Sequence, residues 1–155
     1  MEIVRAAPEQ AGDLTRIALA AKRHWRYPER WLEIWTPALT IAPDYLATNP
    51  TFAAVEAGEP VGFYALVPAP DRSRAQLDHL WILPGRIGRG LGRILFEHAA
   101  ATARSLGATI LDIEAEPFAE PFYLHLGARR TGERTGRIED QPRVLPLLEL
   151  ALTND

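Results

Sequence analysis

The chain has 155 residues with 47% hydrophobic and 24% charged residues, which suits a single globular domain over residues 1–155. It contains no cysteine, which excludes disulfides, thiolate metal sites and a cysteine nucleophile and is compatible with a reducing compartment. The net charge of −3 disfavours a nucleic-acid partner, and the sequence shows neither a membrane-length apolar run nor a secretion signal, so we expect a cytoplasmic protein with no membrane partner.

Apolar spacing and the positions of Pro and Gly predict alternating strands and helices. In chain order we expect a strand at residues 2–6, helices opened by Pro8 and by Pro28, a loop at 43–50, strands at 51–57, 61–67 and 75–83, a helix from Leu91 to before Gly107, a strand at 109–115, a short helix at 118–126, and strands at 129–134 and 144–150. This order is typical of a mixed α/β layer architecture.

Helical spacing also predicts which side chains share a face. In the helix after Pro28 we expect one side to carry Trp31, Ile34, Trp35 and Ala38. In the helix from Leu91 we expect the core face to carry Leu91, Ile94, Leu95, His98, Thr102 and Leu106. His98 is therefore expected to be a packed and hydrogen-bonded core histidine rather than a ligand.

A glycine-rich turn lies between the strand at 75–83 and the helix from Leu91. Residues 84–93 read Pro-Gly-Arg-Ile-Gly-Arg-Gly-Leu-Gly-Arg. Glycines let an anion approach the backbone, and the unpaired N–H groups at a helix start attract phosphate. The spacing fits neither a P-loop nor a dinucleotide fingerprint. A plain glycine-rich connection with an arginine rim is the alternative, but three alternating glycines between a strand and a helix favour a phosphate site.

The turn resembles the acetyl-coenzyme A motif of the GNAT superfamily of N-acetyltransferases, Arg/Gln-x-x-Gly-x-Gly/Ala. Gly90 and Gly92 match its two small positions, whereas Ile87 stands where the family has Arg or Gln and Arg86 lies one residue earlier. Because the family holds the pyrophosphate mainly through backbone N–H groups, Ile87 need not abolish binding.

A second segment with the pattern Ala-x-x-Phe-Tyr-x-x-x-Gly-Ala, from Ala119 to Ala128, is similar to the family's Ala-x-x-Phe-Tyr-x-x-x-Gly-Phe. It departs from the family at Glu116, where Asn is common, and at Pro121 inside the helix. The resemblance spans residues 51–150, while the N-terminal third matches only in its layout. It implies a mixed, mostly antiparallel central sheet of about six or seven strands with helices on both faces.

The resemblance also implies the activity, which is transfer of an acetyl group from acetyl-CoA to a primary amine, with CoA as product. Without a cysteine to carry the acetyl group, we expect direct attack in a ternary complex. The acceptor can be a small-molecule amine or a peptide or protein amine. The residues expected at the acetyl-CoA site are Leu80, Trp81 and Ile82 through their backbone, and Arg86, Ile87, Gly88, Arg89, Gly90, Leu91, Gly92 and Arg93 in the turn.

Three side chains are candidates for proton transfer. Tyr123 occupies the position of the family's usual general acid, and a core tyrosine is the alternative. Strand alternation places Asp78 on the face where family members often carry a base, and His79 on the other face with the better intrinsic pKa. A water molecule acting alone is a further alternative for the base, and no metal site is expected because no histidines share metal-ligand spacing.

The acceptor wall is expected in the N-terminal third, which holds three of the four tryptophans. We expect Trp25, Tyr27 and Trp31 to line it, with residues 132–143 at its border. An exposed apolar strand at 144–150 would suit a homodimer. Two other functions stay open: a non-catalytic acyl-CoA-binding module, and a nucleic-acid-binding domain that uses the arginines of the turn and of residues 129–130.

Overall fold

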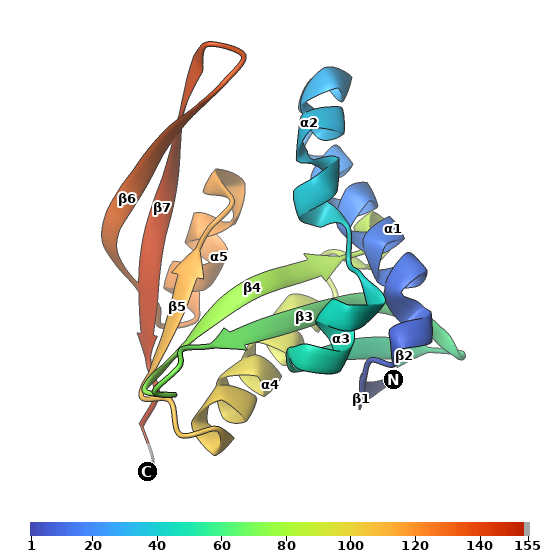
Figure 1. Ribbon diagram of the computed structural model, residues 1–155, viewed down its shortest axis with the longest axis vertical. Coiled ribbons are helices and arrows are strands. Elements are labelled where there is room, and N and C mark those ends of the chain that lie inside the picture. The colour runs from blue at the N-terminus through green and yellow to red at the C-terminus, as the bar shows by residue number, and fades with distance from the viewer. Residues whose placement is uncertain (154–155) are drawn as a thin grey trace. The chain divides into compact units, whose positions relative to one another are not determined.

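A computed structural model describes residues 1–153 (Figure 1). The elements, with 3-10 helices labelled η, are β1 Glu2–Arg5, η1 Pro8–Gln10, α1 Ala11–His24, α2 Glu29–Leu39, α3 Pro43–Thr48, β2 Thr51–Glu56, β3 Glu59–Pro68, β4 Arg74–Ile82, η2 Pro84–Arg86, α4 Leu91–Ser105, β5 Ile110–Glu114, η3 Pro117–Ala119, α5 Glu120–His125, β6 Arg129–Ile138 and β7 Gln141–Ala151. None of the helices in this described part has the length and apolarity of a membrane span.

The described chain consists of two compact units. Unit 1 comprises Met1–Leu66 and His79–Ala99, and unit 2 comprises Val67–Asp78 and the chain from Ala100 onward. The chain passes between the units three times, inside β3, β4 and α4. The unit boundaries thus fall inside secondary-structure elements and not in linkers. The single domain expected from the length stays our prediction.

The seven strands form a sheet in the order β1-β2-β3-β4-β5-β7-β6. Antiparallel ladders join β1 to β2, β2 to β3, β5 to β7 and β7 to β6, while β4 and β5 run parallel. The parallel ladder extends from Arg74↔Ile110 to Leu77↔Ile113, in the first half of β4. The expected mixed, mostly antiparallel sheet is confirmed.

Two tight hairpins depend on left-handed backbone at both turn residues. Ala57 and Gly58 join β2 to β3 with φ of 50° and 81°, and Glu139 and Asp140 join β6 to β7 with φ of 48° and 64°. Positive φ at both central residues is what a type I′ turn requires. The first turn contains Gly58 and lies one residue earlier than the connection expected between strands at 51–57 and 61–67. The acidic pair of the second turn gave no signal in the sequence, so β6 and β7 run several residues further than expected.

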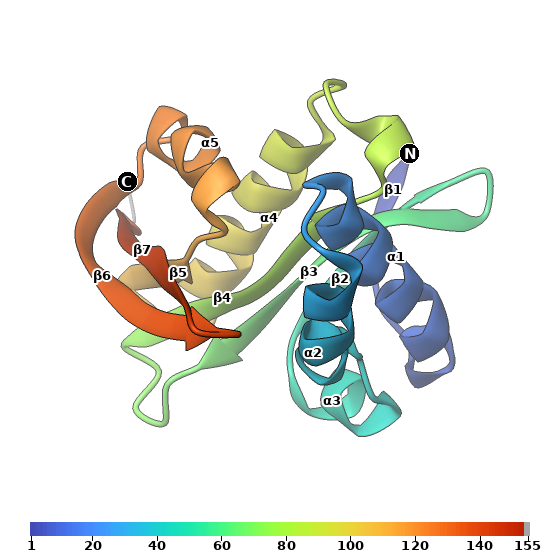
Figure 2. The same ribbon diagram turned by 90° about the horizontal axis from the view of Figure 1, so that it is seen from above.

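The sheet of unit 1 buries its two faces against different helices, as strand alternation requires. Ala53 of β2 and Phe63 of β3 pack with Leu14 and Ile17 of α1 and with Leu46 of α3. The neighbouring strand residues face the first half of α4, which lies on the other side of the sheet from α1 (Figure 2). There the Phe52 ring stacks on Tyr64, and both rings contact His98. Fully burying each large side chain stabilises the fold by about 1.5–3 kcal/mol.

The core face of α4 differs in part from the predicted one. Leu91 and Leu95 are buried as expected, but Ile94 is 41% exposed and Phe96, only 2% exposed, takes its place in the core. The prediction for His98 is confirmed, because its Nδ1 shares a 2.6 Å hydrogen bond with Tyr64 Oη. The buried face of α4 also includes Ala99, Ala100 and Ala103.

Two further expectations about the N-terminal helices were wrong. Residues 43–48, expected as part of a loop, form α3, in which Pro43 occupies the first turn, where a missing N–H costs nothing. In α2 the buried residues are Leu32 and Leu39, while Ile34 is 53% exposed. A face at spacing i, i+7 therefore packs inward, and Trp31 and Trp35 lie half-buried beside it.

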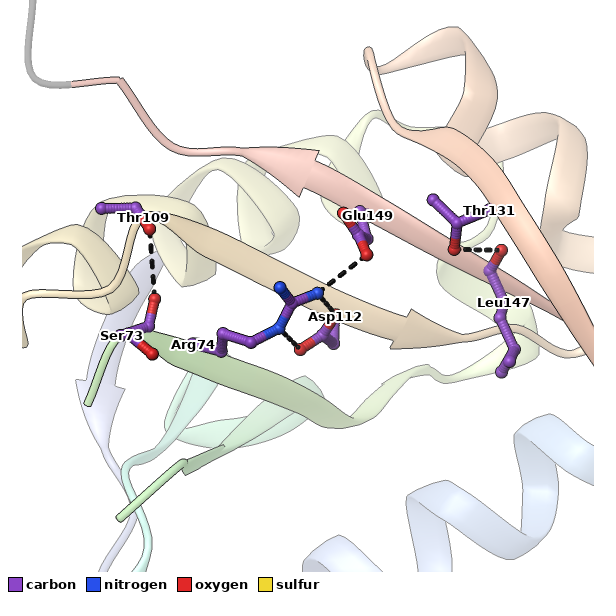
Figure 3. A network of polar contacts seen from close by, with 7 residues as sticks. All are labelled: Ser73, Arg74, Thr109, Asp112, Thr131, Leu147 and Glu149. Carbon is purple, nitrogen blue, oxygen red and sulfur yellow. Dashed lines mark hydrogen bonds and ion pairs between the residues drawn. The ribbon is translucent and has the colours of Figure 1, made fainter. Parts of the chain in front are cut away.

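Unit 2 is stabilised across its strands by one arginine. Arg74 of β4 donates two hydrogen bonds to Asp112 of β5, at 2.6 and 2.8 Å, and one to Glu149 of β7 at 2.8 Å (Figure 3). The bonds to Asp112 and then to Glu149 raise the pKa of the guanidinium above its ordinary value. The bidentate pair joins β4 to β5, and the bond to Glu149 joins β4 to β7 as well.

Strand β7 does not have the position that we expected for a dimer contact. It lies between β5 and β6, and Leu148 on it is only 1% exposed. The outer strand is β6, whose residues are exposed from Arg129 to Arg137. The apolar residues of 144–150 serve the sheet itself, so the reason for expecting a homodimer was wrong.

Candidate active site

The glycine-rich turn folds as a 3-10 turn followed by left-handed glycines and a helix start. Gly88 and Gly90 have φ of 85° and 79°, a region that L side chains adopt only with strain. A Cβ atom built on Gly85, Gly88 or Gly90 would meet no atom within 4 Å. The glycines thus serve the backbone conformation and leave open space over it, rather than relieving a clash inside the protein.

The first turn of α4 presents backbone donors. Ile94 N–H donates to Gly90 C=O at 3.1 Å, which is the first bond of the helix. The N–H groups of Leu91, Gly92 and Arg93 precede it and carry the positive end of the helix dipole. Such an arrangement of backbone donors is suited to an anion and needs no side chain for it.

Two of the three arginines in this turn are held by carboxylates. Arg86 Nε donates to Glu56 at 2.7 Å, and Arg93 Nε donates to Glu97 at 2.8 Å. Arg89 is exposed, as is Ile87 at 47%. The expected mobile positive rim is therefore partly neutralised, and the Arg86 pair joins the turn to the end of β2.

The second half of β4 carries an ordered histidine. Trp81 Nε1 donates to His79 Nδ1 at 2.9 Å, which places the two side chains on one face as predicted. The rings of Tyr45 and Phe63 lie 5.8 and 5.9 Å from the imidazole. An indole nitrogen only donates, so Nδ1 accepts and the neutral ring carries its proton on Nε2.

The remaining β4 residues that we expect at the site are the neighbours of His79 and Trp81 in the sequence. Leu80 and Ile82 are half-buried, and Asp78, at the end of the segment in unit 2, is exposed. Leu83 N–H donates to Val61 C=O at 2.9 Å, so this end of β4 is bonded to β3. Tyr45 is a site residue that the sequence reading missed, because the segment that carries it was interpreted as a loop.

An aromatic cluster lies where α1 connects to α2. The Tyr27 ring lies 6.0 Å from Trp31 and 4.9 Å from Trp35, and the Trp31 and Trp35 rings lie 5.9 Å apart. Lys22 Nζ lies 4.2 Å from the centre of the Trp35 ring and 5.1 Å from that of Tyr27. Tyr27 and Trp31 thus lie in one cluster, and their role at the acceptor site stays a prediction. The buried Lys22 is a member of the cluster that was not predicted from the sequence.

Trp25 has a different neighbour. Its ring lies edge-on to His24 at 5.3 Å, and His24 is the last residue of α1 rather than a loop residue. Arg26, next to it, is exposed and has a φ of 60°. The connection therefore turns sharply between two aromatic side chains.

Tyr123 belongs to α5 in unit 2 and is 7% exposed. Burial raises the pKa of its phenol above the ordinary value, so the hydroxyl keeps its proton through neutral pH. Its ring contacts Phe122 edge-on at 5.1 Å, and its carbonyl accepts a 3.1 Å hydrogen bond from Ala128 N–H at the end of the helix. Pro121 lies in the first turn of α5, the one place where the helix tolerates it.

Glu116, which departs from the family pattern, is held by an arginine. Arg143 of β7 donates a 3.2 Å hydrogen bond to the Glu116 carboxylate. The Arg143 side chain is 16% exposed and the Glu116 side chain 8%. Within residues 1–153, no group of three or more His, Asp or Glu side chains has an arrangement that would hold a metal ion.

The sequence matches a family model and several characterised proteins. Residues 14–128 match the acetyltransferase (GNAT) family. Peptidyl-lysine N-acetyltransferase YjaB of Salmonella typhimurium is 32% identical over 111 residues, which are 71% of this chain and 70% of that protein. Streptothricin acetyltransferase of Streptomyces lavendulae is 39% identical over 69 residues, which are 44% of this chain and 36% of that protein.

Solved structures share the fold. The GCN5-related N-acetyltransferase from Rhodopseudomonas palustris superposes with a TM-score of 0.80 at 23% identity, over 97% of this chain and 95% of that one. PaiA N-acetyltransferase from Thermoplasma acidophilum, solved with coenzyme A, has a TM-score of 0.77 at 16% identity, over 97% and 98% of the two chains. With a family model over most of its length and a relative more than 30% identical, the chain belongs to the GNAT family and is an N-acetyltransferase.

Proposed function

We propose that the protein transfers the acetyl group of acetyl-CoA to a primary amine by direct attack in a ternary complex. The observation that carries this proposal is the turn at residues 84–93, where left-handed Gly88 and Gly90 open the backbone in front of the first N–H groups of α4. Relatives of the same fold are solved with coenzyme A or acetyl-CoA, which supports the donor.

The chain's own groups would hold the donor in two places. The N–H groups of residues 88–93 bind the pyrophosphate, and the backbone of Leu80, Trp81 and Ile82 pairs with the pantetheine arm. One of these β4 N–H groups would polarise the thioester carbonyl, where charge develops during attack. Because only backbone N–H groups would donate to the pyrophosphate, we expect Ile87, in place of Arg or Gln, to lower the affinity for acetyl-CoA only slightly.

We assign the base to Asp78, acting through water, rather than to His79. The Trp81 indole N–H occupies the Nδ1 lone pair of His79, so protonation there would cost that hydrogen bond. Asp78 is exposed to water, so a water molecule could connect its carboxylate to the attacking amine. Asp78→Asn should then lower kcat on the alkaline plateau, while His79→Gln should change mainly KM.

Tyr123 would act as the acid. The amine nitrogen bonds to the acetyl carbon, the carbon–sulfur bond breaks, and the phenol proton goes to the leaving sulfur while the amine loses its own proton to the base. The phenol is protonated at neutral pH, and burial raises its pKa further, so its proton can leave only as negative charge develops on the departing sulfur. No cysteine is present to carry an acetyl group, which supports a single transfer without an acyl-enzyme.

The acceptor is an amine on a peptide or on a small molecule. The related YjaB acts on peptidyl lysine and the related streptothricin acetyltransferase on streptothricin, so the family resemblance alone does not choose between the classes. The aromatic cluster at Tyr27, Trp31 and Trp35 would receive the apolar body of either acceptor.

Acetyl-CoA-dependent thiol release across a panel of peptide and small-molecule amines tests the proposal. The purified chain should bind CoA in a calorimetric titration and release thiol only with an amine present. Tyr123→Phe should keep CoA binding and lose most of the turnover. Binding of CoA without turnover of any amine would instead indicate a non-catalytic acyl-CoA-binding protein. Ile87 and Glu116, which differ from the family's motifs, are the residues that favour this alternative. Absence of both binding and turnover would refute the proposal.

A further inference from the structure

Basic side chains are concentrated in the connection between α1 and α2. Within residues 22–30 the sequence has four Lys or Arg residues and one His against a single acidic residue, Glu29, in a chain whose net charge is −3. We call this segment the basic connection; its basic members are Lys22, Arg23, His24, Arg26 and Arg30. All of them except Lys22 are exposed. The local charge thus opposes that of the whole molecule.

The aromatic cluster fixes the geometry of the basic connection. Lys22 Nζ lies over the Trp35 and Tyr27 rings, which anchors both sides of the connection. Between them Arg26 holds a left-handed φ of 60°, which an L residue adopts at a cost of roughly 1–2 kcal/mol. Arg26 is thus an exposed residue at the point where the chain reverses between Trp25 and Tyr27.

Contacts inside unit 1 join this connection to β4. Trp35, Tyr45 and Trp81 all pack against the same buried cluster of α1, α3, β2 and β3. The Tyr45 ring contacts His79, to which Trp81 is hydrogen-bonded. Helix α1 also contacts η2, the first part of the glycine-rich turn. The basic connection therefore borders the same side of unit 1 as the β4 residues proposed to hold the acetyl donor.

We propose that the basic connection selects acceptors in which the reacting amine lies on a peptide next to aspartate or glutamate side chains. This inference rests on the proposed function and specifies its acceptor. Exposed Arg26 and Arg30 attract the flanking carboxylates, while the aromatic cluster receives the aliphatic part of the acceptor side chain. A polycationic small molecule would meet like charges there and bind weakly.

The test compares three peptides that differ only beside the acceptor lysine, with two aspartates, two asparagines or two lysines. At low salt, kcat/KM for the aspartate peptide should exceed that for the asparagine peptide by about three- to tenfold, mainly through KM. The lysine peptide should be the poorest. Because the basic side chains are exposed, 0.5 M salt, with a Debye length of roughly 4–5 Å, should remove most of the difference.

Variants assign the effect to the basic connection. The double variant Arg26→Glu and Arg30→Glu should invert the order of the peptides, and Arg26→Gln and Arg30→Gln should abolish it with less risk to folding. Arg16→Glu is the control for Arg26→Glu made alone, because Arg16 is exposed on α1 outside the connection and the two single substitutions make the same charge change. KM for acetyl-CoA should not change in any of them.

The outcomes separate this inference from the proposed function. Equal turnover of the three peptides, or a preference that the Arg26 and Arg30 variants keep, would overturn the inference and leave the acetyltransfer intact. Faster turnover of the lysine peptide or of a polyamine would also overturn it. If no amine is acetylated although CoA binds, the proposed function fails and the inference with it.

Discussion

Replacing Gly90 by alanine tests whether the left-handed turn binds acetyl-CoA. The substitution meets no neighbouring atom, since a Cβ at Gly90 has nothing within 4 Å, so only the backbone conformation and the approach of the ligand are perturbed. At a φ of 79° an alanine costs roughly 1–2 kcal/mol relative to glycine. The unbound variant can relieve this strain by relaxing its exposed turn, and binding must then restore the left-handed φ. Because 1.4 kcal/mol corresponds to a factor of ten, the Kd for acetyl-CoA should rise by up to about 5- to 30-fold.

Three matched variants make the interpretation specific. Gly85→Ala adds the same methyl group in equally open space, but its φ lies outside the left-handed region, so it should bind acetyl-CoA normally. Gly58→Ala imposes the same strain, at a φ of 81°, in the β2–β3 hairpin and should lower stability without changing the Kd. Gly90→Asn should fall between Gly90 and Gly90→Ala, because asparagine tolerates the left-handed region.

The assay is calorimetric titration with CoA and acetyl-CoA, alongside urea unfolding of each variant. A Gly90→Ala protein that binds acetyl-CoA as tightly as the native chain would refute the role of the left-handed turn. Equal weakening by Gly58→Ala and Gly90→Ala would show that general destabilisation, rather than the turn, controls the affinity.

Three other predictions concern stability and the β4 strand. In Gly62→Ala the new Cβ would lie 3.1 Å from the Trp81 carbonyl oxygen, so we expect a loss of about 1–3 kcal/mol in urea unfolding and a lower kcat/KM for acetyl-CoA; unchanged values would contradict the packing. Burial raises the pKa of Tyr123, so its contribution to stability is complete below the unfolded-state value of about 10 and is lost as pH rises above it. The free energy of unfolding should fall with pH in that range, and less steeply in Tyr123→Phe; identical slopes would refute this. Arg74→Met should cost roughly 1 kcal/mol because the side chain is 40% exposed, while Arg93→Met, at 66% exposure, should cost only a few tenths, and equal losses would count against a structural role for Arg74.

The local parts of the site were predictable from the sequence, whereas the parts made by distant segments were not. Alternating glycines after a strand and before an apolar helix indicate a turn with little side-chain cover, so the turn at residues 84–93 was expected before its φ angles were known. Arg74 meets residues 38 and 75 positions away, and no pattern in the sequence connects such partners. Tyr45 was missed for a similar reason, because its contact with His79 joins a helix between two prolines to a strand 34 residues later.

Helix faces were the least predictable feature. In both α2 and α4 the apolar residues cover more than half of the circumference, so spacing alone does not decide which of them turn inward. The packing against the sheet determines the buried face. Leu95 packs over Gly62, where a Cβ would lie 3.1 Å from the Leu95 side chain, and Phe96 rather than Ile94 is buried. Without the register of β3, the rotation of α4 could not be derived.

Lys22 is the only lysine in the chain, and it is 8% exposed with its ammonium over two aromatic rings. The folded chain therefore presents no exposed lysine side chain to amine-directed reagents. Chemical acetylation by acetyl-CoA in solution has almost no target on the catalyst itself, which keeps the background low when modified lysines are counted by mass spectrometry. Appearance of label on Lys22 would report opening of the α1–α2 segment.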